Sequence, residues 1–202
     1  DRIWDKIVLL NSIENVDLIG EKFSDIARMR GIDPYDLVFD LLLEEGAAMH
    51  QLLWTSNSFS QSDLELCLEQ EECAVISDTL ALAPYGPLEK KVGSLSGYGW
   101  TPEFLSKYVN EKKIISIEEG IRRITSLPAE RLGVKDRGIL KENMKADIVV
   151  FDTGSIRSTW TFKEPRSYPK GIEHVFVNGR QTISAGERTS VNNGTVLRAP
   201  FA

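Results

Sequence analysis

The stretch 125–152 constrains the fold more than any other part of the chain, because its pattern changes from helical to strand-like. A capped helical segment ends at Gly133, and glycine is typical of the position just beyond a helix C-terminus. Gly138 lies in the turn that follows, and the apolar run Ile148–Phe151 indicates a strand. We therefore expect a domain boundary within residues 136–145, with a first domain over 1–137 and a small β-domain over 138–202.

Before this boundary, strand patterns alternate with helix patterns. Three short segments are typical of strands buried in a sheet: Trp4–Leu10, Met49–Trp54 and Ala74–Ser77. Helix patterns lie between them, at Glu21–Arg30, from Asp33 to about Gly46, and after the capping pair Ser62 and Glu65. This alternation predicts βα units and a parallel sheet or barrel.

The segment from Thr79 to Gly99 has neither helix nor strand periodicity and is rich in Gly, Pro, Ser and Tyr. Such a long segment without periodicity is unusual inside a compact domain and often forms an active-site loop. Helix patterns resume at Thr101–Lys107 and after a second capping pair, Ser116 and Glu119.

Beyond Gly138 the pattern is that of a β-domain. Strand patterns lie on both sides of Asn178-Gly179, and this dipeptide between strands is a strong hairpin signal because both turn residues need positive φ. Asn193-Gly194 repeats the signal near the end of the chain.

The composition limits the classes of partner and compartment. The formal net charge is −6 and Lys and Arg form no basic run, so we expect no nucleic-acid partner. The longest apolar runs, such as Leu41–Leu43, are too short to cross a bilayer, so we expect no membrane partner. Cys67 and Cys73 give no disulfide framework and favour a reducing, cytoplasmic compartment.

Five features, taken in order, resemble one enzyme family. They are the helical segment Gly20–Gly46, the pair Ser77-Asp78, the pair Tyr98-Gly99, the tract Leu127–Gly138 and the hairpin segment Gly171–Gly179. This series is similar to the amidohydrolase superfamily, and most closely to the D-aminoacylase (N-acyl-D-amino-acid deacylase) family. The resemblance implies an α/β fold in which the last strands and helices of a (β/α)8 barrel are followed by part of a small β-sandwich domain. Because the chain begins at Asp1 without an initiator Met, we expect the C-terminal portion of a longer enzyme.

The resemblance also implies a chemistry. It implies a metal-dependent hydrolase that cleaves the amide C–N bond of a small molecule, an N-acyl-D-amino acid, with zinc in the full-length parent. Asp78 is then the catalytic aspartate, which transfers protons and is a possible metal ligand. Ser96, Tyr98 and Gly99 are the implied substrate-binding residues. Without the resemblance, Asp78 can equally be a helix cap or a loop carboxylate that faces water, and Tyr98 an aromatic plug under the loop.

The substrate loop and the metal ligands depart from the family. Many members carry His-Pro-Arg and one further residue before the Tyr-Gly pair, where this chain has Ser94–Gly97, so a cation that could bind a substrate carboxylate is lost. This departure allows a cyclic-amide hydrolase of the dihydroorotase or hydantoinase kind as an alternative. The two histidines, His50 and His174, are interpreted as structural or surface residues, because a catalytic zinc usually has three protein ligands.

We therefore expect the 202-residue chain alone to bind no zinc and to be no competent hydrolase. A third interpretation is a non-catalytic remnant that serves in binding or assembly. A partial barrel would expose unpaired strand edges and apolar surface, which favour self-association, so we expect a homo-oligomer.

Overall fold

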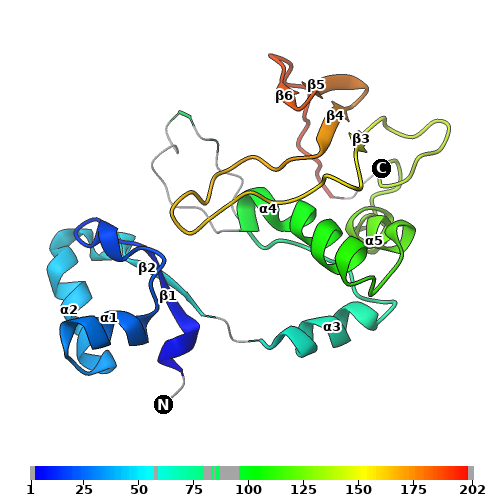
Figure 1. Cartoon of the computed structure of the whole chain (residues 1–202). Coiled ribbons are helices and arrows are strands. Elements are labelled where there is room, and N and C mark those ends of the chain that lie inside the picture. Colours follow the sequence, from blue (N-terminus) through cyan, green and yellow to red (C-terminus); the bar gives the residue numbers. More distant parts are fainter. Residues whose placement is uncertain (1–2, 57–58, 80–82, 84, 87–95, 200–202) are drawn as a thin grey trace. The chain divides into compact units, whose positions relative to one another are not determined.

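A computed structural model describes residues 3–56, 59–79, 83, 85–86 and 96–199. The chain divides into two compact units (Figure 1). The first unit comprises Asp1–Leu64 with Thr161–Glu164, and the second comprises Glu65–Trp160 with Pro165–Ala202. The expected boundary between residues 137 and 138 stays a prediction.

The first unit pairs two helices with a two-stranded sheet. Strand β1 (Ile7–Asn11) pairs with β2 (Leu53–Ser56), and the helices α1 (Phe23–Arg30) and α2 (Pro34–Glu45) lie between them in the sequence. Short 3-10 segments complete the unit: η1 (Trp4–Lys6), η2 (Val16–Leu18) and η3 (Gly46–Gln51).

Local signals explain where these helices begin and end. Gly31 follows α1 in the left-handed conformation, with a φ of 67°, which glycine adopts at little cost. The Asp33 side chain accepts a 2.8 Å hydrogen bond from the Tyr35 amide, and Pro34 occupies the first turn of α2. The predicted end of α2 at Gly46 is confirmed.

The helices bury one apolar face against the strands. The core residues of this unit are Leu9, Phe23, Ile26, Ala27, Leu37, Leu41 and Leu52. The Phe23 ring stacks on Trp4 at a centroid distance of 6.3 Å and meets Trp54 edge-on at 5.7 Å. The Phe23 ring of α1 therefore packs against both the segment before β1 and strand β2.

The expected parallel pairing is wrong for these strands, because β1 and β2 run antiparallel. In a parallel pair, one helix usually carries the chain back to the end where the first strand began. Here two helices, α1 and α2, lie between the strands, so the chain enters β2 in the opposite direction to β1. All strand pairs in the described part of the chain are antiparallel.

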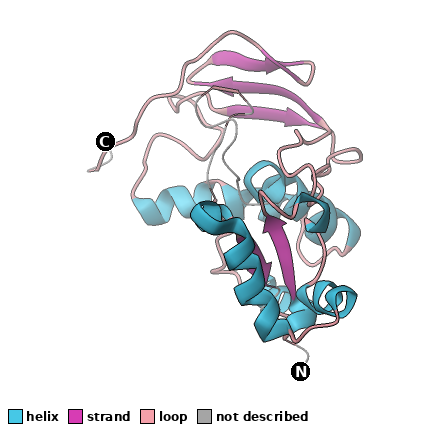
Figure 2. Ribbon diagram, turned by 90° about the vertical axis from the view of Figure 1, so that its left-hand side faces the viewer, coloured by secondary structure: helices cyan, strands magenta, loops and turns pink. Residues whose placement is uncertain are grey.

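The second unit contains helices and a four-stranded antiparallel sheet. Helix α3 (Gln61–Glu69) leads into it from the first unit and is followed by α4 (Ser96–Glu103), the π-helix η4 (Phe104–Glu111), α5 (Ile117–Ile124) and α6 (Ser126–Leu132). The sheet, visible in Figure 2, has the order β3 (Ile148–Phe151), β4 (Ile172–Val177), β5 (Arg180–Ser184) and β6 (Glu187–Arg188).

The core of the second unit joins the helices to the sheet. Its buried residues are Leu68, Phe104, Leu105, Tyr108, Val109 and Ile156. Gly120 of α5 lies so close to η4 that a Cβ atom there would approach Val109 Cγ2 to 2.8 Å. The missing side chain thus allows the two helices to pack closely. The predicted hairpin is confirmed, with φ values of 48° at Asn178 and 77° at Gly179.

Other local predictions need correction. The expected strand Ala74–Ser77 is irregular, because its Val75 amide bonds to α5 rather than to a strand. The third helix is capped by Ser60, whose hydroxyl accepts from the Asp63 amide at 3.1 Å, and not by Ser62. The helix expected at Thr101 already begins at Ser96 and continues as a π-helix from Phe104.

The second turn signal does not form a hairpin. Instead, the Asn193 side-chain amide donates to the Val177 and Asn178 carbonyls at 3.0 and 3.2 Å. It therefore braces the β4–β5 turn. Of the expected loop Thr79–Gly99, residues 80–82, 84 and 87–95 lie outside the described residues, and its last four residues belong to α4.

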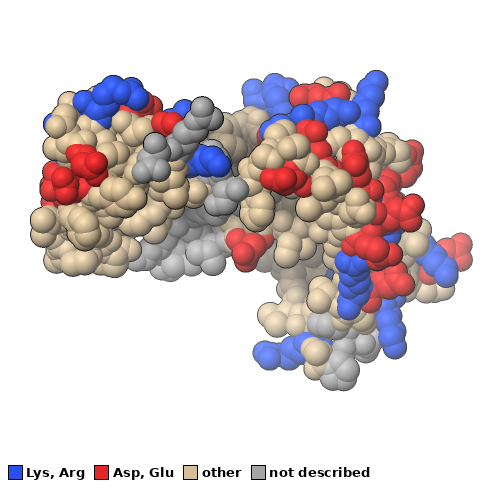
Figure 3. Space-filling model, turned by 90° about the horizontal axis from the view of Figure 1, so that it is seen from below, with Lys and Arg blue, Asp and Glu red and all other residues tan. Residues whose placement is uncertain are grey.

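Charged side chains of both signs are interspersed on the face shown in Figure 3. Several form ion pairs, such as Arg28 with Asp25 at 2.8 Å and Arg30 with Glu44 at 2.8 Å. Among the described residues, no helix is both long enough and apolar enough to cross a membrane.

Candidate functional site

Asp78 lies at the end of an irregular segment that follows α3. Its carboxylate-bearing side chain is exposed, and its backbone adopts a φ of 44°. Aspartate tolerates this left-handed region better than most residues, but the conformation is still uncommon. Three residues earlier, the Val75 amide donates a 3.0 Å hydrogen bond to the Arg123 carbonyl of α5. Asp78 thus lies at the end of a segment that is hydrogen-bonded to α5.

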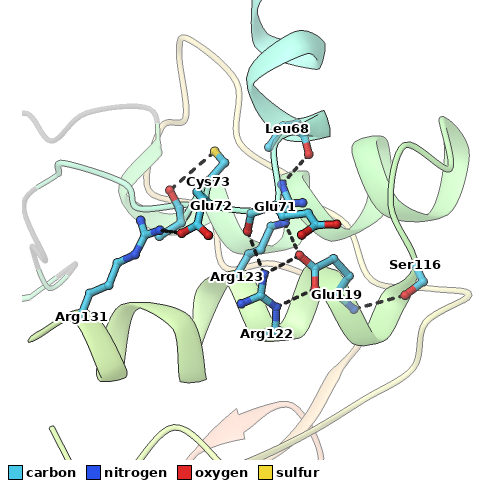
Figure 4. A network of polar contacts seen from close by, with 10 residues as sticks. Leu68, Glu71, Glu72, Cys73, Ser116, Glu119, Arg122, Arg123 and Arg131 are labelled. Carbon is cyan, nitrogen blue, oxygen red and sulfur yellow. Dashed lines mark hydrogen bonds and ion pairs between the residues drawn. The ribbon is translucent and has the colours of Figure 1, made fainter. Parts of the chain in front are cut away.

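Helix α5 carries the polar groups that hold this segment. The helix begins after Ser116, whose hydroxyl accepts from the Glu119 amide at 3.2 Å, so the Ser116 half of the predicted capping pair is confirmed. The Glu119 carboxylate binds arginines instead of completing the pair. Glu119 then faces Arg122 and Arg123, three and four residues along the helix, at 2.6 and 2.7 Å. We call Glu119, Arg122, Arg123 and Arg131 the arginine cluster (Figure 4).

The arginine cluster binds the end of α3 and the residues after it. Arg123 donates to the Leu68 carbonyl, and Arg122 donates to the Glu71 carbonyl at 2.8 Å. Arg131 of α6 donates to the Glu72 carboxylate at 2.5 Å. Glu71 and Glu72 thus bind the arginine cluster in different ways, Glu71 through its backbone carbonyl and Glu72 through its exposed carboxylate.

The electrostatics of the cluster favour the charged forms. Hydrogen bonds from Arg122 and then Arg123 lower the pKa of Glu119 from its ordinary 4.5 to about 2. The bond to Glu119 in turn raises the pKa of Arg122. The ion pair of Glu119 with Arg122 and Arg123 therefore favours the carboxylate form of Glu119.

The predicted substrate-binding residues lie on α4. Ser96 begins this helix, and Tyr98 and Gly99 follow in its first turns. The Tyr98 ring meets Tyr168 edge-on at a centroid distance of 5.4 Å. Burial raises the pKa of the Tyr98 hydroxyl, and Tyr168 adds to that rise. The hydroxyl therefore stays protonated and can donate a hydrogen bond.

Gly99 is buried against a tryptophan. A Cβ atom at this position would lie 2.4 Å from Cδ1 of Trp160 and 3.0 Å from Cβ of Ser158. Glycine is needed here because α4 and Trp160 approach so closely. The structure thus brings Tyr98 and Gly99 together with Tyr168 and Trp160, while Asp78 follows the segment bound to α5. That Asp78, Ser96, Tyr98 and Gly99 form a single site stays a prediction.

Neither histidine belongs to a metal-binding cluster among the residues that the structure describes. His50 is exposed in η3. His174 lies in β4, where its Nδ1 accepts from the Ala185 amide at 3.2 Å and lies 3.0 Å from Nε2 of Gln181. Across the described ranges, no three His, Cys, Asp or Glu side chains gather to hold a metal ion. The Asp78 carboxylate alone does not fit a zinc centre, which usually has three protein ligands.

An apolar cavity of about 500 Å³ lies within the second unit, and the sequence patterns did not predict it. Helix α5 lines it from one side and strands β3 and β4 from the other, mainly through Ile121, Ile124, Ile148, Phe151 and Ile172. Among the described residues, its lining includes neither Asp78 nor Tyr98. The helical spacing of Ile121 and Ile124 was the available signal, but it indicates a packed face equally well.

Comparison with known proteins places these features in a family. Residues 24–183 match the amidohydrolase family. The chain therefore belongs to the amidohydrolase family.

Among curated relatives, N-acyl-D-aspartate deacylase of Alcaligenes xylosoxydans xylosoxydans is 30% identical over 181 residues, which are 90% of this chain and 33% of the relative. D-aminoacylase of the same organism is 28% identical over 181 residues, again 90% of this chain and 34% of the relative. The expected resemblance to D-aminoacylases is confirmed, and the chain spans about a third of the length of these relatives.

A more distant relative is dihydroorotase of Lactobacillus acidophilus, which is 30% identical over 124 residues, 57% of this chain and 28% of the relative. A crystal structure of D-aminoacylase has a TM-score of 0.74 at 23% identity and covers 95% of this chain and 38% of its own. N-acyl-D-glutamate deacylase of Bordetella bronchiseptica, solved with zinc and a phosphonate inhibitor, has a TM-score of 0.67 at 25% identity, over 90% and 35% of the two chains. The α/β fold is therefore similar to that of D-aminoacylase.

Proposed function

We propose that this protein belongs to a metal-dependent hydrolase of amide C–N bonds, of the N-acyl-D-amino-acid deacylase type. The supporting observation is the similarity to N-acyl-D-aspartate deacylase over 90% of this chain. The complete enzyme would be a polypeptide that carries these residues together with the remaining length of its relatives. We also propose that residues 1–137 belong to its barrel and residues 138–202 to a small β-sandwich domain. In the barrel, the antiparallel β1 and β2 would not be neighbouring barrel strands.

Asp78 is the proposed catalytic residue. Its exposed carboxylate can take a proton from the water that attacks the amide carbonyl, and return it to the nitrogen when the C–N bond breaks. The Tyr98 hydroxyl, whose pKa burial raises above its ordinary value, can donate a hydrogen bond to the substrate. Replacement of Asp78 by Asn in the complete enzyme tests this role. We expect a loss of turnover of about 10²- to 10⁴-fold, as is usual when a general acid–base is removed.

Zinc is the proposed cofactor of the complete enzyme, supported by the zinc in the N-acyl-D-glutamate deacylase structure. Because the described residues offer no group of three ligands, we propose that the chain alone binds no zinc and has no hydrolase activity. Elemental analysis of the purified chain, paired with its intact mass, tests this. Near-stoichiometric zinc, or turnover that chelation abolishes, would contradict it.

The alternative is a cyclic-amide hydrolase of the dihydroorotase kind. The similarity to the Lactobacillus acidophilus dihydroorotase supports it, as does the missing cation at Ser94–Gly97. An assay of the complete enzyme against N-acyl-D-amino acids and cyclic ureides separates the two. Hydrolysis of the ureides alone would favour the alternative.

Self-association is the proposed assembly of this chain. Strand β3 is an edge strand that pairs, among the described strands, with β4 alone. All four of its residues are apolar, and Val149 and Val150 are 52% and 44% exposed. An exposed apolar edge of this kind favours pairing with a second copy. The nearby Ile139 and Leu140, 53% and 77% exposed, extend the apolar surface into the cavity lining.

A further inference from the structure

Arg123 is the most unusual side chain of the second unit, because it is a cation that is only 1% exposed. A buried charge is costly unless it is paired and fully hydrogen-bonded. Arg123 meets this condition through the Glu119 carboxylate at 2.7 Å and the Leu68 carbonyl. Its burial therefore depends on both α5 and the end of α3.

The same residue also holds the other end of the segment that leads to Asp78. Its backbone carbonyl accepts from the Val75 amide at 3.0 Å, so Arg123 contacts the chain at residues 68 and 75. Arg122 adds a third contact between them, at the Glu71 carbonyl. Figure 4 shows these side chains converging on the segment from the α5 side. The segment Leu68–Val75 is thus hydrogen-bonded to α5 at three points.

The backbone conformation of Asp78 depends on the structure around it. Its φ of 44° lies in a sparsely populated region, and such conformations persist only where the surrounding structure determines them. The next residue, Thr79, has a buried hydroxyl without a partner in the described part of the chain. Among the described residues, the Thr79 side chain thus adds no hydrogen bond that would hold the peptide around Asp78, and the bonded chain before it is the restraint that the structure shows.

We propose that Arg123 is a positioning residue for Asp78. It fixes the segment Leu68–Val75 through its side chain and its backbone, so that the Asp78 carboxylate is presented in one orientation. This inference rests on the proposed catalytic role of Asp78. It assigns to Arg123 no contact with substrate.

The first test uses the 202-residue chain and hydrogen exchange of the Cys73 and Val75 amides, which donate to the Gln70 and Arg123 carbonyls. Arg123→Lys keeps the charge but loses the fork that reaches both Glu119 and Leu68. We expect faster exchange at these amides, by about tenfold or more, which corresponds to a local loss of 1.4 kcal/mol or more. Arg131→Lys is the matched control, since Arg131 binds only the exposed Glu72 side chain of the same segment. Unchanged protection of these amides in Arg123→Lys would show that the Arg123 side chain does not hold the segment.

The second test measures turnover in the complete enzyme, in a double-mutant cycle with Asp78→Asn. We expect Arg123→Lys to lower kcat by about 10- to 100-fold with little change in KM, because misplacement of a catalytic group costs this much. In the Asp78→Asn background, measured over long incubations, the same substitution should have almost no further effect. Equal losses in both backgrounds would mean a merely structural role and would overturn the proposal.

The two tests distinguish failure of this inference from failure of the proposed function. Full activity of Asp78→Asn would remove the catalytic role of Asp78 and, with it, the positioning role of Arg123. The exchange result would then still show whether Arg123 holds the segment. Loss of activity in Asp78→Asn with an unaffected Arg123→Lys enzyme would overturn the positioning role alone.

Discussion

The Arg137 guanidinium donates a 2.7 Å hydrogen bond to the side-chain oxygen of Asn178, across 41 residues of sequence. Arg137 also binds the Asp147 carboxylate, which in turn accepts from the Asn178 amide at 2.7 Å. These three residues join the turn after α6, the start of β3 and the tip of the β4–β5 hairpin. Arg137 thus ties three separate segments of the second unit together through a carboxylate and a side-chain amide.

Arg137→Met should destabilise the second unit. The substitution removes the guanidinium that donates to Asp147 and to the Asn178 oxygen, although Asp147 still accepts from the Asn178 amide. The loss of a largely buried, charged hydrogen-bond partner typically costs about 1–3 kcal/mol. Urea unfolding followed by circular dichroism measures the change. The control is Arg157→Met, because Arg157 is exposed and its guanidinium donates to the nearby Ser155 carbonyl, while its backbone bond to Lys170 does not depend on the side chain. Equal stabilities of the two variants would contradict the importance of the Arg137 contacts.

Features set by neighbouring residues were predictable from the sequence. The cap at Asp33 with Pro34, the cap at Ser116, and the Asn178-Gly179 turn each depend on atoms within a few residues. The segment Ala74–Ser77 is as apolar as a strand, but its Val75 amide donates to the Arg123 carbonyl of α5 and not to a neighbouring strand. Strand patterns state which residues are buried and not which neighbour accepts their hydrogen bonds.

The candidate site divides in the same way. Asp78, Tyr98 and Gly99 could be named because short motifs carry them. The close approach of Trp160 to Gly99, and the bond from Arg123 to Leu68 across 55 residues, depend on tertiary packing that a single sequence does not encode visibly. The spacing of Glu119, Arg122 and Arg123 is compatible with helical ion pairs, but it does not indicate that Arg123 is buried.

Glu119 should make the stability of the chain depend on acid pH. Because its folded pKa of about 2 lies below its ordinary 4.5, its contribution is fully present above pH 4.5 and is lost as the pH falls towards 2. Glu119→Gln should therefore be less stable than the unchanged chain at neutral pH, and this difference should shrink between pH 4.5 and 2. Urea unfolding across this range gives the measurement.

Glu111→Gln is the control for the pH series, because Glu111 is exposed at the end of η4. Its stability should follow that of the unchanged chain at each pH. A Glu119→Gln variant whose deficit stays constant down to pH 2 would contradict the ion pair with Arg122 and Arg123.

Gly99→Ala should displace Trp160. Alanine favours a helix by about 1 kcal/mol over glycine, whereas overpacking of a filled site costs about 1–3 kcal/mol. Since the new Cβ would lie 2.4 Å from the indole, we expect the cost to prevail and the tryptophan emission to change. Gly194→Ala is the control, because a Cβ there meets nothing within 4 Å. Unchanged emission and stability in Gly99→Ala would show that Trp160 does not depend on this contact.

Val150→Lys should weaken self-association through the β3 edge. Lysine on an edge strand opposes pairing with another strand, because its charge would be buried against the partner. Light scattering after size-exclusion chromatography should find an oligomer for the unchanged chain, and a dissociation constant raised by about tenfold or more in the variant, equivalent to at least 1.4 kcal/mol. Leu43→Lys, at a residue of α2 that is 78% exposed, removes apolar surface away from the edge and should leave assembly unchanged. A monomeric unchanged chain, or the same weakening in both variants, would rule out β3 as the interface.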